Sequence, residues 1–302
     1  RSRGLGDVYK RQEYDNAGNP TRFVSNYGDV AQSGFGGVIV ENRMLGEMYL
    51  RQPYRGNGSY SEGKPDINAG PVDGMIRTES DMAWVKAMIA DGYKFNGVTK
   101  VAKDQLWYGD LIYADANGDG NYGDTNDMNF TGTSTQPRYN FGLNLSVAYK
   151  GFDFYMLWAG SAGFDLYWNH SSYNGTRTEN GFGISQRVAD NHYFYNPENP
   201  SDSRTNITAK YPRITDQTQR DNGTSSVFWK YKGDYVKLKN IQIGYTIPVK
   251  WTRKFMVEKL RFYFSGENLL TITSYPGLDP EMGTSITYPL TRQFAFGAQL
   301  SF

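Results

Sequence analysis

RQFAFGAQLSF, residues Arg292–Phe302, alternates strictly between two kinds of side chain. One set is Phe294, Phe296, Ala298, Leu300 and Phe302, and the other is Gln293, Ala295, Gly297, Gln299 and Ser301. Period-two alternation predicts a β-strand with one apolar and one polar face. Its length suits a tilted membrane-spanning strand, which needs roughly 9–11 residues. A soluble β-domain can also end on such a strand, but an exposed terminal aromatic suits the aromatic belt of a membrane interface.

The segment 139–150 shows the same alternation. Its apolar face comprises Tyr139, Phe141, Leu143, Leu145, Val147 and Tyr149. Aromatic residues mark both ends of this face and aliphatic residues fill its middle, which is typical of a lipid-facing barrel wall. In a soluble sandwich we would expect the aromatics in the middle. Lys150–Gly151 predicts a tight turn, after which Phe152, Phe154, Met156 and Trp158 begin a return strand that we expect to continue towards Trp168.

The remaining elements are less regular. We expect a hairpin over 13–27, a strand at 37–40, a helix over 78–91, a strand over 235–247 and another that begins at Leu260. The apolar residues of 235–247 change phase, which predicts a β-bulge near Lys239–Asn240. The helix has a capping-box pair, Thr78 and Asp81, and is expected to lie on a loop rather than form a domain core. The polar segments 169–233 and 274–288 are expected to be long loops.

Composition narrows the class of protein. The chain has 302 residues, a net charge of +1 and 38% hydrophobic residues. No apolar run approaches the roughly 18 residues of a spanning helix, whereas alternating barrel strands keep average hydropathy low. Near-neutral charge gives no indication of a nucleic-acid partner. The absence of Cys excludes disulfides, thiol nucleophiles and Cys-ligated metals.

Residues 1–12, RSRGLGDVYKRQ, match no strand or helix pattern. We interpret them as a non-native or unstructured leader, with an ordinary basic linker as the alternative. No signal peptide is visible, yet the body looks exported. We therefore expect residues 13–302 to be the C-terminal portion of an outer-membrane β-barrel whose upstream part is absent.

The segment Asp115–Gly120, DANGDG, matches the opening of a calcium-binding loop. Hard cations prefer oxygen ligands, and alternate positions of such a loop converge on one point. The candidate ligands are Asp115, Asn117, Asp119, Asp124 and Asp127, although the closing carboxylate is expected at position 126, which is Asn. The alternative is a turn that is held by bonds between its own side chains and backbone, without a metal. Apart from this candidate structural calcium, no cofactor is expected.

Catalytic motifs are weak in this sequence. Gly118, Gly120 and Gly123 spell G-x-G-x-x-G, but no buried strand precedes them and no helix follows, so a dinucleotide site is not expected. His170 and His192 have no acid or nucleophile at a recognisable spacing and are interpreted as loop residues. A glycosidase would need two paired carboxylates, and no such pair is readable. We predict that the protein is not an enzyme.

The segment Asp234–Pro248, DYVKLKNIQIGYTIP, resembles the SusC/RagA-type TonB-linked outer-membrane transporters. Four other segments agree with this family in the expected order, so that the resemblance covers residues 36–302. They are GDLIYADANGDG from Gly109, YKGFD from Tyr149, the run from Tyr263 through SGENLL to GLDPE at 277–281, and the last strand. The Asn at position 126 departs from the calcium pattern and puts cation binding in doubt.

The resemblance implies the C-terminal strands of a barrel of about 22 strands that is occluded by a plug. It implies uptake of glycans or peptides, a SusD-like surface lipoprotein as partner, and energy from the TonB complex. It places the protein in the outer membrane of a Gram-negative bacterium of the Bacteroidetes type. It also places the turns at Lys150–Gly151 and around Trp251 in the periplasm, and the DANGDG loop and the loops 169–233 and 274–288 outside.

The predicted fold class is therefore all-β: antiparallel transmembrane strands, long extracellular loops and one short loop helix. The predicted lipid face includes Phe141, Leu143, Leu145, Phe294, Phe296, Leu300 and Phe302. The alternative is a secreted β-rich adhesin or glycan-binding module, in which these side chains meet in a soluble core. A second layer of chain that buries them would contradict the barrel.

Overall fold

A computed structural model describes residues 11–14, 20–25, 28–29, 44, 46–63, 65–168, 183–215, 222–283 and 290–302. Among these residues the fold is all-β, with mostly antiparallel sheets and few helices, as predicted. The chain divides into two compact units. Unit 1 is residues 1–134 with 167–230, and unit 2 is residues 135–166 with 231–302. The segment 13–302, which was expected to be a portion of the barrel, includes residues of both units.

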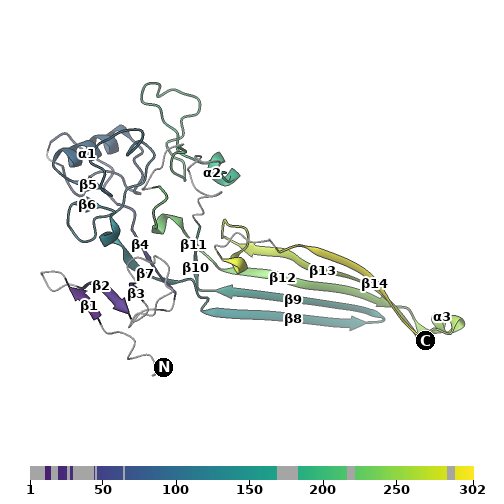
Figure 1. Ribbon diagram of the computed structural model, residues 1–302. Helices are drawn as coiled ribbons and strands as arrows, with labels where there is room; N and C mark the ends of the chain where they lie inside the picture. Colours follow the sequence, from purple (N-terminus) through teal and green to yellow (C-terminus); the bar gives the residue numbers. More distant parts are fainter. Residues whose placement is uncertain are drawn as a thin grey trace. The chain divides into compact units, whose positions relative to one another are not determined.

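Unit 2 contains an antiparallel sheet of five strands in the order β14-β13-β12-β9-β8 (Figure 1). The strands are β8 (Tyr139–Tyr149), β9 (Phe152–Ala162), β12 (Tyr235–Thr246), β13 (Lys259–Thr273) and β14 (Gln293–Ser301). Each strand expected from 139 onwards is present. Strand β9 ends at Ala162, short of the expected Trp168, because Gly163 takes a φ of 79° and leaves the extended conformation.

The register of the sheet places its alternating apolar residues on one face. One row of opposed residues runs across all five strands: Val147, Phe154, Ile243, Phe264 and Phe296. Directly opposed residues point to the same face, so a shift of one residue anywhere would move apolar side chains to the polar side. The five separate alternations therefore add up to a single apolar surface.

The bulge predicted near Lys239–Asn240 is confirmed. The register shifts between Leu238 and Asn240 in the pairing of β12 with both of its neighbours. Against β9 the extra residue is Lys239, and it brings Leu238 to the same face as Ile241, although the two are three positions apart in the sequence and would point to opposite faces in an uninterrupted strand. The bulge thus keeps both halves of β12 in phase with the apolar surface.

The connections within unit 2 are short at one end of the sheet. The predicted tight turn is confirmed, with φ values of 47° at Lys150 and 89° at Gly151. Strands β12 and β13 are joined by α3 (Val249–Thr252) and the 3-10 helix η4 (Arg253–Phe255). At the other end, the β13–β14 loop contains the 3-10 helix η5 (Pro280–Met282), and residues 284–289 lie outside the described residues.

Helix α1 (Glu79–Ala90) has the predicted Thr78–Asp81 capping box and is followed by Gly92 at a φ of 100°. We expected a helix lying on a loop, but its Met82, Trp84, Val85 and Met88 are buried at the centre of the hydrophobic core of unit 1. That part of the prediction was wrong because the rest of the core comes from segments without periodicity. They supply Tyr54, Met75, Ile76, Leu106, Leu111, Ile112, Tyr113 and Tyr193.

Short strands complete the described part of the chain. They are β4 (Glu47–Leu50) with β7 (Asn129–Ser134), β5 (Lys94–Phe95) with β6 (Asn121–Tyr122), β10 (Asp165–Tyr167) with β11 (Lys230–Lys232), and the sheet of β1 (Arg11–Tyr14), β2 (Pro20–Ser25) and β3 (Gly28–Asp29). The expected hairpin at 13–27 is thus present, and its first strand includes Arg11 and Gln12 of the expected leader. The strand expected at 37–40 lies outside the described residues. Helix α2 (Gln186–Asp190) and the 3-10 helices η1 (Thr125–Asp127) and η3 (Val227–Trp229) lie in unit 1.

Gly70 tests how tightly the core of unit 1 is filled. Its φ is +85°, and an added Cβ would lie 2.5 Å from Cδ2 of Trp84. We expect Gly70→Ala to lower the free energy of unfolding by about 2–4 kcal/mol, since a left-handed Ala is strained and the core has no room. Gly92→Ala is the matched control, because its φ is +100° and nothing lies within 4 Å of the added Cβ. It should cost about 1 kcal/mol. Equal losses in denaturant unfolding of the two variants would contradict this view of the core.

Candidate lipid-facing surface and calcium loop

One face of the unit 2 sheet is apolar and exposed. The predicted lipid-facing residues Phe141, Leu143, Leu145, Phe294, Phe296 and Leu300 share it, and their exposure ranges from 40% for Leu145 to 83% for Phe296. Phe302 follows β14 and is also exposed. Among the described residues these side chains are therefore not enclosed in the soluble core that the alternative interpretation requires.

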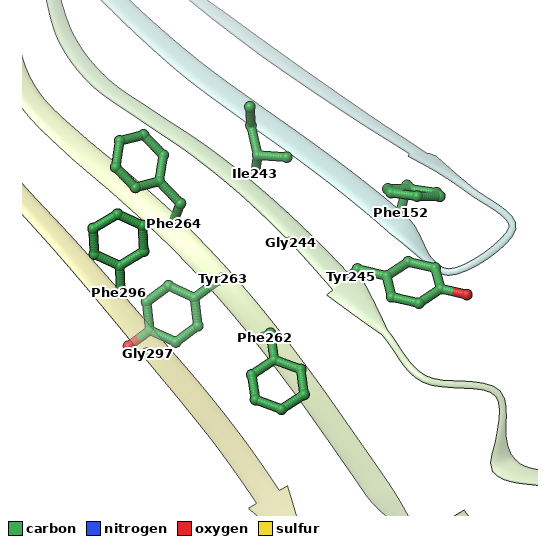
Figure 2. Close-up of a pocket in the computed structure, with 9 residues that line it drawn as sticks. All are labelled: Phe152, Ile243, Gly244, Tyr245, Phe262, Tyr263, Phe264, Phe296 and Gly297. Carbon is green, nitrogen blue, oxygen red and sulfur yellow. The ribbon is translucent and has the colours of Figure 1, made fainter. Parts of the chain in front are cut away.

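This face carries an open groove of about 290 Å³, which Figure 2 shows. Its lining residues are Phe152, Ile243, Gly244, Tyr245, Phe262, Tyr263, Phe264, Phe296 and Gly297. The rings of Phe264 and Phe296 are 5.0 Å apart between centroids, and those of Phe152 and Tyr245 are 4.5 Å apart. No charged residue lines the groove, so it has little to orient a polar ligand and suits hydrocarbon.

The opposite face of the sheet is polar. Asp153 of β9 and Arg261 of β13 form an ion pair across the strand between them, with Arg261 Nε 2.9 Å from Asp153 Oδ1. They can meet because β12 has Gly244 at this point, where an added Cβ would lie 2.5–2.6 Å from their terminal atoms. Tyr263 lies over Gly297 in the same way. These pairings were not predictable from the sequence, because only the register of the strands creates them.

A cluster of charges fixes the β13–β14 loop to strand β12. The side chain of Lys237 is 2% exposed, and its Nζ lies 2.5 Å from Asp279 Oδ1 and 2.8 Å from Glu281 Oε2. Lys239 Nζ lies 2.5 Å from Glu281 Oε1. Burial alone would raise the pKa of Glu281, but hydrogen bonds from the two lysines outweigh it and hold that pKa below its usual range. The residues belong to DYVKLKN and GLDPE, both singled out in the sequence, but their pairing was not predictable.

The five candidate calcium ligands lie in one loop and accept hydrogen bonds from backbone amides. Asp115 accepts from Gly118 at 2.7 Å and Gly120 at 2.9 Å, and Asp127 accepts from Ala116 at 2.6 Å and Gly123 at 2.7 Å. Asn117, Asp119 and Asp124 each accept from the amide two residues further on. This is the bonding expected of the alternative, a turn held by its own side chains.

Asp127 is the most enclosed of these side chains, with 1% exposure. Burial raises the pKa of its carboxyl, and the amide hydrogen bonds from Ala116, Gly123 and Asn117 oppose this shift. In the described part of the chain, no group of three or more His, Asp or Glu side chains is arranged to hold a metal ion. Calcium binding stays a prediction, and the hydrogen bonds do not favour it.

The described part of the expected long loop, 183–215 and 222–229, is folded into unit 1. Its Tyr193, Tyr211 and Trp229 are almost fully buried. Asp110, also fully buried, accepts hydrogen bonds from Arg213 Nε at 2.7 Å and Asn222 Nδ2 at 2.9 Å. This segment is therefore part of a core, which its polar composition concealed.

The two histidines add no catalytic geometry to the described residues. His192 Nδ1 lies 2.6 Å from the carbonyl oxygen of Ala189, a local contact that fits the predicted loop role. His170 lies outside the described residues. Of the helices that the structure describes, none is both long enough and apolar enough to cross a membrane.

Two curated proteins of Formosa agariphila are similar to this chain. TonB-dependent receptor P3 is 31% identical over 235 residues, which cover 70% of this chain and 22% of the relative. TonB-dependent receptor P39 is 27% identical over 286 residues, which cover 88% of this chain and 26% of the relative. The chain thus spans about a quarter of the length of these relatives. No family model matches it.

A solved structure also resembles the chain. The RagAB peptide importer in its 'closed-closed' state has a TM-score of 0.50 and 21% sequence identity, over 64% of this chain and 21% of the solved chain. A likeness at this level of identity concerns the fold. It agrees with the all-β antiparallel architecture described above.

The buried pair of Asp110 and Arg213 provides a test of how unit 1 is held together. Asp110→Asn would leave Arg213, whose side chain is 14% exposed, without its counter-charge. We expect a loss of about 3–5 kcal/mol in the free energy of unfolding, because an uncompensated charge would stay buried. Asp202→Asn is the control, since Asp202 pairs with an Arg204 side chain that is 72% exposed, and surface pairs contribute little. If Asp110→Asn leaves the free energy of unfolding in urea unchanged, the ion pair is dispensable.

Proposed function

We propose, from the premise that this chain belongs to the SusC/RagA-type TonB-dependent transporters, that unit 2 forms part of the membrane-spanning wall of an outer-membrane importer. The observation that carries the proposal is the apolar face of its sheet. That face is exposed, runs across five strands in register and contains no charged residue. Lipid acyl chains are the surroundings that suit such a face.

The size of the apolar face argues against water as its medium. Contiguous apolar patches on monomeric soluble proteins rarely exceed a few hundred Å². In this sheet Phe141, Leu143, Phe264 and Phe296 are among many exposed or half-exposed apolar side chains on one surface. The distribution along β8, with aromatics at both ends and aliphatics between, supports placement across a bilayer with rings at its interfaces.

The opposite face supports a polar lumen. Barrel strands alternate between lipid-facing and lumen-facing residues, so the polar face of this sheet would line the interior. There the Asp153–Arg261 pair satisfies two charges within the wall. The contacts of Lys237 with Asp279 and Glu281 hold the β13–β14 loop against the same strand that lines the lumen. Such a loop would narrow the passage at a fixed position, and the mechanism is selective passage rather than bond-making.

Substrate and partners concern the whole transporter, and this chain spans about a quarter of the length of its relatives. We infer uptake of glycans or peptides with a SusD-like surface lipoprotein and energy from the TonB complex. The solved structure that resembles this chain is named a peptide importer, which supports peptides as the class of substrate. Loops rich in Tyr, Trp and Asn suit sugar stacking as well as contact with a protein lid. We place the transporter in the outer membrane of a Gram-negative bacterium of the Bacteroidetes type, without an enzymatic activity or a nucleic-acid partner.

Leu143 and Asn144 provide a matched pair for the orientation of the sheet. They are neighbours on β8, both exposed, and lie on the apolar and polar faces respectively. We expect Leu143→Arg to disfavour insertion into phospholipid vesicles by about 2–4 kcal/mol, because a charge would meet acyl chains. Asn144→Arg adds the same charge to the polar face and should insert as the parent does. Heat-modifiable gel migration after refolding measures how much of each variant has inserted. A protein that tolerates both changes and stays monodisperse without detergent would instead be the secreted module.

Uptake assays test the importer itself. Residues 197–204 form the tip of a loop. Backbone hydrogen bonds between Phe194 and Asn206 close this loop at its base. Replacing this tip with a Gly-Ser linker of the same length keeps the buried residues of unit 1, so the barrel should still assemble. We expect the uptake of a fluorescent oligopeptide or oligosaccharide to fall at least severalfold in cells that carry the variant. If the parent takes up neither class of compound above the background of a deletion strain, the importer assignment fails.

A further inference from the structure

The two short connections of unit 2 lie together at one end of its sheet. The amide of Thr246, the last residue of β12, donates to the carbonyl of Gly151 in the β8–β9 turn at 2.8 Å. The β12–β13 connection follows directly through α3 and η4, and Figure 1 shows both at the same end of the strands. We name as the basic-aromatic end the side chains of Lys150, Lys250, Trp251, Arg253, Lys254 and Phe255.

Positive charge is concentrated at the basic-aromatic end. Its four cations are exposed, and none takes part in an ion pair among the described residues. The acidic residues in and beside the two connections are Glu258 and Asp153, and Asp153 is already paired with Arg261. The surface therefore has a surplus of positive charge that the described residues do not neutralise.

Large apolar side chains stand between these cations. Trp251 is 67% exposed and Phe255 is 76% exposed, and the neighbouring Met256 is 86% exposed. Lys150 Nζ lies 5.2 Å from the ring centroid of Tyr149, so a cation and an aromatic are also combined in the β8–β9 turn. Aromatic rings and basic side chains occupy the boundary between headgroups and acyl chains for complementary reasons: the rings prefer the boundary, and the cations reach the phosphates.

We propose that the basic-aromatic end binds the anionic headgroups of phospholipids through Lys150, Lys250, Arg253 and Lys254, while Trp251 and Phe255 insert below the headgroups. This inference rests on the proposed function, in which unit 2 spans a bilayer. The end would then select anionic lipid for the layer around the transporter and fix the depth of the sheet in the membrane.

Two observations favour a lipid surface over a second protein. The charge surplus complements phosphate, whereas a symmetric contact with another copy would bring its like charges together. The surface is also continuous with the proposed lipid face, because Phe152 and Tyr245, whose rings are 4.5 Å apart, lie where that face meets the turns. A bilayer that covers the apolar face would reach these cations without any further partner.

Nanodiscs of defined composition test the inference on the full-length transporter. The variant combines Lys150→Gln, Lys250→Gln, Arg253→Gln and Lys254→Gln. The control combines Lys86→Gln, Lys94→Gln, Lys100→Gln and Arg187→Gln, which remove the same charge from exposed positions of unit 1. In discs that hold phosphatidylcholine and phosphatidylglycerol in equal amounts, native mass spectrometry counts the lipids retained by each protein.

We expect the parent and the control to retain phosphatidylglycerol in preference to phosphatidylcholine, and the variant to lose that preference. Each basic residue near an anionic surface contributes on the order of a fivefold preference. Salt at about 1 M should weaken the preference of the parent, because headgroup contacts are screened. A bimane label on Met256→Cys, in a background without other cysteines, should be quenched more by brominated phosphatidylglycerol than by brominated phosphatidylcholine.

The outcomes separate the two proposals. Equal retention of phosphatidylglycerol by parent and variant, with both inserted in discs, would overturn the headgroup assignment and leave the proposed function intact. A parent that does not enter these discs would overturn the proposed function. Self-association of the parent that the variant lacks, at equal lipid retention, would assign the surface to a second copy and overturn the lipid proposal.

Discussion

The antiparallel register of the five-stranded sheet is the constraint from which the other features of unit 2 follow. Each strand alternates on its own, but alternation gives a surface only if neighbouring strands agree on which residues face each other. The row from Val147 to Phe296 exists because four successive pairings agree. Since a slip of one residue would exchange the two faces of a strand, the apolar surface and the backbone ladder specify one another.

The exceptions to regular alternation serve this register. The bulge at Lys239 corrects the phase of β12, so that Leu238 joins the apolar surface although uninterrupted alternation would place it on the polar face. Gly244 leaves the space in which Asp153 and Arg261 meet across a strand. The polar face is therefore shaped by the absence of side chains as much as by their presence. The change of phase along β12 already indicates the bulge in the sequence, whereas the role of Gly244 is invisible until the strands are aligned, because Asp153 and Arg261 are close only in the sheet.

The sequence predicted the strands of unit 2 well and the core of unit 1 poorly. Period-two alternation located β8 and β14 almost to the residue, and the change of phase in β12 located the bulge. Unit 1 gave few such signals, since its core combines one helix with loop residues such as Tyr54 and Leu111, which follow no period. The lipid-facing residues could be predicted because they are periodic. The pairs Asp110–Arg213 and Lys237–Asp279 could not be predicted. Their partners are 103 and 42 positions apart in the sequence, and only the fold brings them together.

The division of the sheet between two distant segments has a consequence for its folding. Strands β8 and β9 form one hairpin and β12 to β14 form one meander, each with contacts that are local in the sequence. The pairing of β9 with β12 joins them, and the whole stretch from 167 to 230 lies between these strands in the chain. Closing so long an intervening segment costs conformational entropy before any hydrogen bond between β9 and β12 can offset it. The β9–β12 seam should accordingly be the last of the four pairings to form, and the place at which slow assembly would leave two unpaired edges open to aggregation.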